Sequence, residues 1–100
     1  RAYVADEVGR SWADVVATGQ VADDRKVALR LAANAVAEAA IGAVDRCYTS
    51  AGGEAVYRRS PLQRVFRDIH VASQHAMVAG RVFEPLGRFE FGLETDTGGL

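Results

Sequence analysis

Apolar residues recur at helical spacing along most of the chain, and they almost never alternate as they would in a strand. Between residues 2 and 18, Ala5, Val8 and Trp12 repeat every three or four positions, with charged residues between them. This pattern predicts an amphipathic helix whose apolar stripe faces a core, with Trp12 as an anchor. Gly19 predicts the end of this helix.

A second and longer helix is predicted over residues 24–51, which are rich in alanine. Alanine has the highest intrinsic helix propensity, and its small side chain lets other helices approach closely. Arg30, Asn34 and Glu38 stand four residues apart and predict one polar edge. The remaining sides are too apolar to be covered by two neighbours, so we expect further helices or other subunits to cover them.

A third helix is predicted over residues 61–86. Ser60 occupies the N-cap position, a proline follows it, and Gln63 is the third helical residue, which together predict a capping box. Pro85 and Gly87 predict the end of the helix.

Three long helices joined by short connections predict an all-α fold, an antiparallel helical bundle. We expect residues 1–86 to form this domain, completed by further helices or subunits. Residues 87–100 form a glycine-rich C-terminal tail, which we expect to be loosely held or to lie on a neighbouring chain.

Composition limits the classes of function. The net charge of -1 argues against a nucleic-acid partner, because such proteins carry a basic excess. The single cysteine, Cys47, excludes an internal disulfide, predicts a cytoplasmic location and suits a small core position. We expect no membrane span, since no apolar run approaches the roughly 20 residues that a bilayer requires. The chain begins at Arg1 and not at methionine, so we expect it to be cut from a longer protein.

The third predicted helix carries the candidate chemistry. At about 100° per residue, Arg64, Asp68 and His75 fall on one line at the border of the apolar face. The simplest interpretations are a surface ion pair between Arg64 and Asp68 and a half-buried His75 with a backbone partner. His70 is expected to be exposed. It lies five residues from His75, which places the two on different sides and disfavours a metal site.

The stretch "GGEAVYRRSPLQRVFRDIHVASQHAMVAGRVFEPLGR" resembles the C-terminal helical domain of the acyl-CoA dehydrogenase fold. Within that fold it is most similar to the two-component flavin-dependent monooxygenases. The marks of the resemblance are Ser60–Arg64, then Arg67–Asp68, then His75, and the closing Gly87–Arg88.

One departure from the dehydrogenases is informative. Many of them carry a Tyr-Glu-Gly-Thr segment after the Arg-Asp pair, whose glutamate removes the substrate α-proton. Here the corresponding residues are Gln74-His75-Ala76-Met77, which include no carboxylate. The resemblance implies that His75 is a catalytic residue facing the flavin ring, as a hydrogen-bond donor to the flavin–oxygen adduct or as a base for a phenol. It places Gln74 beside it as a cofactor contact.

The resemblance also implies cofactor contacts before the third helix. Gly52 and Gly53 occupy the place of a Gln-x-x-Gly-Gly element that approaches the flavin phosphates of a neighbouring subunit, and glycine permits that approach. Thr49 stands where the family has the glutamine, so FMN and FAD both stay open. Arg67 is implied as a phosphate or subunit contact, with Arg64 as the alternative, and Asp68 as the orienting group.

The function implied by this resemblance is hydroxylation of a small aromatic or related substrate with O2 and reduced flavin (FMN or FAD). The flavin would come from a separate flavin reductase, and the protein would form a homotetramer. The 100 residues alone are expected to be inactive. Two alternatives stay open at this point: an acyl-CoA dehydrogenase-like oxidoreductase whose base lies elsewhere, and a stand-alone helical oligomerisation module.

Overall fold

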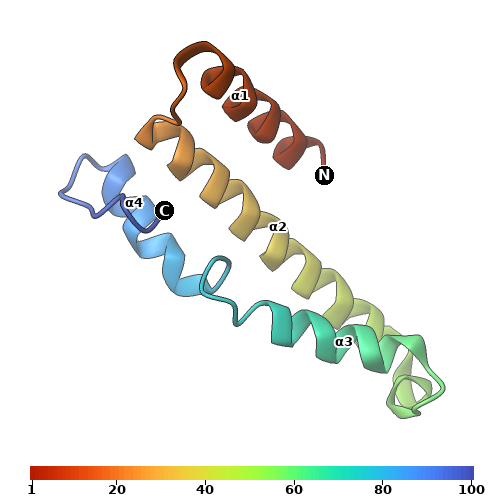
Figure 1. The fold of residues 1–100 in the computed structure, drawn as a ribbon. Coiled ribbons are helices and arrows are strands. Elements are labelled where there is room, and N and C mark those ends of the chain that lie inside the picture. Colours follow the sequence, from red (N-terminus) through yellow and green to blue (C-terminus); the bar gives the residue numbers. More distant parts are fainter.

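The computed structural model describes all residues from 1 to 100, and every regular element in it is helical (Figure 1). The α-helices are α1 (Ala2–Thr18), α2 (Asp23–Ser50), α3 (Pro61–Ala72) and α4 (Phe83–Glu90). Two short 3-10 helices, η1 (Gly52–Val56) and η2 (Gly80–Val82), lie between them. The predicted all-α class is confirmed, and the first two helices lie within one residue of their predicted bounds.

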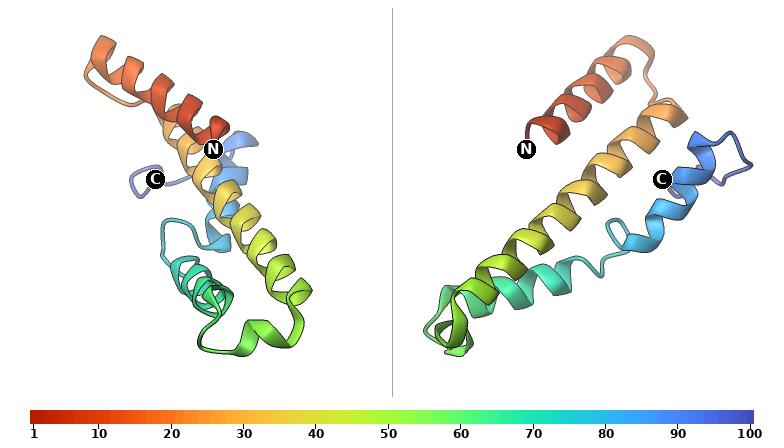
Figure 2. Two further views of the ribbon diagram at one scale, coloured as in Figure 1. Left: turned by 90° about the vertical axis from the view of Figure 1, so that its right-hand side faces the viewer. Right: turned by 180° about the vertical axis from the view of Figure 1, so that it is seen from behind.

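Helix α2 is the spine of the molecule. Helix α1 runs antiparallel along one side of its first half, while α3 and then α4 return along the other side (Figures 1 and 2). The chain measures 52 × 28 × 17 Å and has a radius of gyration of 16.9 Å. A compact domain of this length has a radius of about 13 Å. The helices therefore form an extended layer around α2 and not a closed bundle.

Charged side chains attach α1 to α2. Arg25 donates from Nε to Asp14 Oδ2 at 2.8 Å and from Nη1 to Glu7 Oε2 at 3.3 Å. The hydrogen bond to Asp14 raises the pKa of Arg25, and Glu7 adds to the effect. The predicted apolar stripe of α1 is not a core here: Trp12 is 69% exposed and Val16 70%. The prediction of Trp12 as a core anchor was wrong because α1 docks through its polar side.

The predicted third helix is broken in two. Helix α3 ends at Ala72, and turns occupy residues 73–79 before η2 and α4 continue in the same general direction. The hydroxyl of Ser73 donates to the carbonyl of His70 at 2.8 Å, which satisfies one of the acceptors left free at a helix end. No proline marks this break and the first glycine, Gly80, comes only after it, so the spacing of apolar residues could not reveal it.

The predicted signals at the helix ends were only partly correct. Ser60 is the N-cap residue of α3 and Pro61 follows at N1, but the Ser60 side chain makes no capping hydrogen bond. Pro85 and Gly87 lie inside α4 and do not end it. Proline fits the first turn of a helix because its missing N–H has no intrahelical partner there.

The C-terminal tail folds back onto α2. The Thr97 hydroxyl donates to Asp23 Oδ2 at 3.0 Å, and Arg30 Nη2 donates to the Gly99 carbonyl at 3.2 Å. The terminal Leu100 packs against the core cluster. The expectation of a loosely held tail was therefore wrong, because three of its residues contact α2 or its neighbours.

The core of this chain is small. Only 10 of its 100 residues are buried, and the fully apolar cluster consists of Val27, Val82 and Leu86. Cys47, predicted as a core residue, is exposed. Many large apolar side chains of this layer are exposed, which is typical of a surface that other helices cover.

Helix α2 is long and apolar enough to cross a membrane when only its length and composition are considered, so the expectation that no such run exists was wrong. The central helix of a water-soluble fold meets the same criterion. Here α2 contacts α1, α3 and α4 and buries Arg30 and Asn34 among them. These features match a central helix.

Candidate functional site

The predicted site residues lie in two groups beyond the opposite ends of α3, with Arg67 inside the helix. At 1.5 Å per residue, the twelve residues of α3 separate its ends by roughly 18 Å. Thr49, Gly52 and Gly53 lie before α3, at the far end of α2, and Arg67 lies within α3. Gln74 and His75 follow α3 in the turns that lead back along α2 (Figure 1).

Exposed backbone marks the first group. Gly52 adopts a left-handed conformation, with φ of 57°, which glycine tolerates and most other residues do not. A side chain built at Gly52 or Gly53 would meet nothing within 4 Å, so both present open backbone. Thr49 is exposed in the last turn of α2. This surface suits close approach by a partner or a ligand from outside the chain.

A basic hollow lies along the first half of α3. Its walls are Arg58, Gln63, Arg64 and Arg67, it has no apolar lining, and its volume is about 380 Å³. One carboxylate is near: Asp68 lies 4.0 Å from Arg64, and both side chains are well exposed. Three guanidinium groups and a single nearby carboxylate give the hollow a cationic excess, so its donors fit a phosphate group.

The second group is a turn segment and not a helical stripe. Since α3 ends at Ala72, His75 does not continue the line of Arg64 and Asp68, and its side chain is exposed rather than half-buried. The main-chain N–H of Met77 donates to His75 Nδ1 at 3.2 Å. The predicted backbone partner of His75 therefore exists, although its burial was predicted wrongly. Gln74 is exposed next to it and donates from Nε2 to Ser73 Oγ at 3.4 Å.

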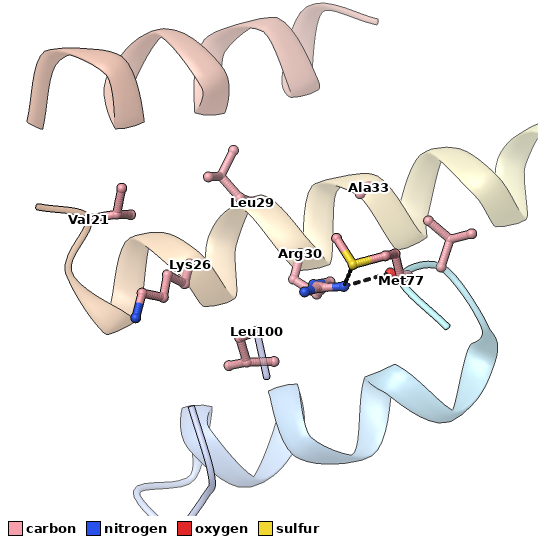
Figure 3. A pocket seen from close by; sticks show the side chains of 8 residues that line it. Val21, Lys26, Leu29, Arg30, Ala33, Met77 and Leu100 are labelled. Carbon is pink, nitrogen blue, oxygen red and sulfur yellow. Dashed lines mark hydrogen bonds between the residues drawn. The ribbon is translucent and has the colours of Figure 1, made fainter. Parts of the chain in front are cut away.

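Two residues of α2 hold this turn segment, and sequence reasoning assigned them only to a polar edge. Arg30 is 8% exposed and Asn34 is completely buried. Arg30 Nη1 donates to the carbonyl of Met77 at 3.3 Å and lies 2.9 Å from its sulfur (Figure 3). Asn34 Nδ2 donates to the same carbonyl at 3.3 Å. Their four-residue spacing was visible in the sequence, but nothing there indicated that they face Met77.

A larger hollow lies along this contact. It has a volume of about 530 Å³ and is open to solvent between α2, the turn segment and the C-terminus (Figure 3). Its lining is mainly apolar and comes from Val21, Lys26, Leu29, Arg30, Ala33, Met77, Val78 and Leu100. None of the predicted site residues lines it.

A second contact joins α2 to α3. His70 Nε2 lies 2.9 Å from Asp45 Oδ1, with side chains 40% and 45% exposed. The ring of Phe66 stacks between His70 and Tyr48, with both centroid distances at 4.5 Å. The expectation that His70 is simply exposed was wrong, because its ring bridges the two helices. No group of three or more His, Cys, Asp or Glu side chains is arranged to hold a metal ion.

Comparison with known proteins identifies the domain. Residues 1–79 match the family model described as acyl-CoA dehydrogenase, C-terminal domain, a segment that includes all six predicted site residues. The chain is 38% identical over 77 residues to a pigment production hydroxylase of Rhodococcus erythropolis, covering 76% of this chain and 20% of that protein. It is 29% identical over 92 residues to an indole-3-acetate monooxygenase of Pseudomonas putida, covering 92% of this chain and 24% of that protein.

The chain thus spans about a fifth to a quarter of the length of these curated relatives. No solved structure matches it significantly. The predicted resemblance is confirmed by the family match and by two relatives named as oxygenating enzymes. This chain belongs to the acyl-CoA dehydrogenase C-terminal domain family, on its hydroxylase-like branch.

Proposed function

We propose that this chain is the C-terminal domain of a flavin-dependent monooxygenase that hydroxylates an aromatic or related substrate with O2. The observation that carries the proposal is its similarity to a hydroxylase and to a monooxygenase over most of its length. When bound, reduced flavin supplies the activation of O2. This chain would supply contacts to two flavins, one of which belongs to a neighbouring subunit.

The geometry of α3 supports two flavin contacts and not one. His75 and Gln74 follow one end of α3, whereas the open glycines precede its other end, and the helix between them is roughly 18 Å long. The basic hollow lies along the first half of α3. One flavin ring would face His75, while the phosphates of a neighbouring subunit's flavin would meet Gly52, Gly53 and Arg67. Such sharing requires an oligomer, and we propose a homotetramer. The exposed apolar side of α1 supports burial against other subunits or domains.

His75 is the proposed catalytic residue. With Nδ1 accepting from the Met77 N–H, the neutral ring carries its proton on Nε2 and presents a donor to the exposed side. A donor at that position stabilises negative charge that develops on oxygen beside the flavin. The turn segment, residues 73–79, contains no Asp or Glu, so this chain offers no carboxylate for dehydrogenase chemistry at that place.

The proposal is tested with the full-length protein and a separate flavin reductase that supplies reduced FMN or FAD. Indole-3-acetate and simple phenols serve as probe substrates. The expected result is product formed in step with O2 consumption, and a His75→Gln variant that still binds flavin but releases most of the O2 as hydrogen peroxide. Desaturation of an acyl thioester, or failure to bind either flavin, would refute the proposal. Unchanged coupling in His75→Gln would remove His75 alone from it.

A further inference from the structure

The turn segment that carries His75 is held by polar groups that belong to another part of the chain. The carbonyl of Met77 accepts from two donors on α2: Arg30 Nη1 and Asn34 Nδ2, each at 3.3 Å. The N–H of the same residue donates to His75 Nδ1 at 3.2 Å. The carbonyl group of Met77 thus contacts α2, and its N–H group contacts the imidazole ring of His75.

Both donors on α2 are buried, so water cannot readily replace Met77 as their hydrogen-bond partner. Asn34 has no exposed surface, its Nδ2 also donates to the Arg30 carbonyl at 2.8 Å, and its Oδ1 has no partner. Turning the amide over would set Oδ1 against two carbonyl oxygens. The position therefore uses asparagine as a donor, and it leaves a buried acceptor unsatisfied to do so.

Arg30 also depends on main-chain partners from other segments. The whole residue is 8% exposed, and it forms no salt bridge with a carboxylate. Its partners are the Met77 carbonyl, the Met77 sulfur and the Gly99 carbonyl. A buried cation compensated only by two main-chain carbonyls and a thioether sulfur requires both segments to stay in place, because otherwise the charge loses its hydrogen bonds.

We propose that Arg30 and Asn34 are positioning residues that fix the tautomer and direction of His75 through the two main-chain groups of Met77. An N–H pointing at Nδ1 excludes a proton there, so the neutral ring holds its proton on Nε2. If Met77 turned away, Nδ1 would be free to carry the proton, and the donor would no longer have one direction. This inference rests on the proposed role of His75, since its purpose is to aim that donor.

Solid-state NMR of the full-length protein labelled with ¹⁵N-histidine tests the inference directly. His75 is assigned by difference against His75→Gln, and the tautomer is read from the two ring nitrogens near pH 8. The expected wild-type ring is protonated on Nε2 alone. Asn34→Leu and Arg30→Met are expected to give a mixture of both tautomers, and Arg30→Lys, which keeps a donor, to restore part of the wild-type signal.

Lys26→Met is the matched control. Lys26 lies one helical turn before Arg30 and lines the same hollow, but its amino group pairs with Asp23 at 3.1 Å and not with Met77. It should leave the tautomer of His75 unchanged. Because the spectrum needs no turnover, it is read separately from the hydroxylation assay.

The outcomes are distinguishable. A wild-type ring protonated on Nδ1 would overturn the inference whatever the enzyme's activity. A wild-type Nε2 tautomer that survives in both Asn34→Leu and Arg30→Met would show that α2 does not set it. If Asn34→Leu fails to fold, the wild-type spectrum and the pair Arg30→Met and Arg30→Lys still decide. The expected spectra together with unchanged coupling in His75→Gln would retain the positioning and refute the proposed catalytic role.

Discussion

Arg30 donates a hydrogen bond to the main-chain carbonyl of Met77, 47 positions further along the chain. Met77 lies in the break between α3 and α4, so this contact joins the central helix α2 to the segment that carries His75. A continuous helix would use the Met77 carbonyl within itself, so the break and the buried arginine depend on each other.

Substitution of Arg30 by methionine should loosen the turn segment. Hydrogen bonds from charged groups contribute about 1.5–3 kcal/mol each, and the Met77 carbonyl would lose one of its two donors. Removal of the buried charge offsets part of that loss. We expect faster amide hydrogen exchange across residues 73–82, measured by mass spectrometry on the full-length protein. Equal protection in Arg30→Met and in the control Lys26→Met would contradict this.

Arg67→Ala should weaken binding of a phosphate-bearing flavin. Loss of one guanidinium from the basic hollow is expected to raise the Kd for FMN about tenfold, equivalent to about 1.4 kcal/mol. Riboflavin, which lacks the phosphate, should bind the variant and the wild type alike. Arg59→Ala is the control, because Arg59 pairs with Glu54 at 3.1 Å and does not line the hollow. Equal losses for FMN and riboflavin would exclude phosphate recognition by Arg67.

The His70–Asp45 contact should contribute modestly to docking of α3 on α2. Both side chains are nearly half exposed, so solvent screening limits the coupling to about 1 kcal/mol or less. A double-mutant cycle with His70→Phe and Asp45→Asn, read by urea unfolding, measures it. The same cycle for Arg64 and Asp68, 4.0 Å apart and more exposed, should give a value near zero. The reverse order of the two couplings would argue against the observed docking.

Two lessons about prediction follow from these helices. The bounds of α1 and α2 were predictable because helical spacing and a closing Gly19 are local signals. The break after Ala72 was not, because the residues that bind the turn segment there, Arg30 and Asn34, are distant in sequence. The site divided in the same way. His75 and Gly52 could be named as candidates from the sequence, whereas the spacing of Arg30 and Asn34 predicted a polar edge but did not indicate that they bind Met77.

Acid should release the tail from α2. Hydrogen bonds from Lys26 and then Thr97 lower the pKa of Asp23 below its ordinary value of 3.8. A lowered folded-state pKa means that the stabilisation is complete above that ordinary value and is lost as the pH falls through the folded-state pKa. We expect hydrogen exchange of residues 93–100, corrected for intrinsic rates, to rise below about pH 4. Thr97→Val should already exchange faster at pH 6 and respond less to acid.

Trp12→Glu should impair assembly of the full-length protein. A charge in the centre of an apolar helical face opposes its burial against another surface. We expect smaller particles by mass photometry than for the wild type. Arg10→Glu is the control, because Arg10 pairs with Asp6 on the exposed side of α1. An intact assembly in Trp12→Glu would place the oligomer contacts elsewhere.

The charged attachment of α1 has a further consequence for its register along α2. Two helices that contact only through apolar side chains can slide or rotate at a small cost in free energy. The guanidinium group of Arg25, by contrast, can bind Asp14 and Glu7 together in only one register of α1 along α2. The exposed apolar side chains Val8, Trp12 and Val16 therefore have a fixed position along α2 before another surface covers them. A partner that packs on α1 therefore meets an apolar surface whose register relative to α2 is already fixed by ion pairs.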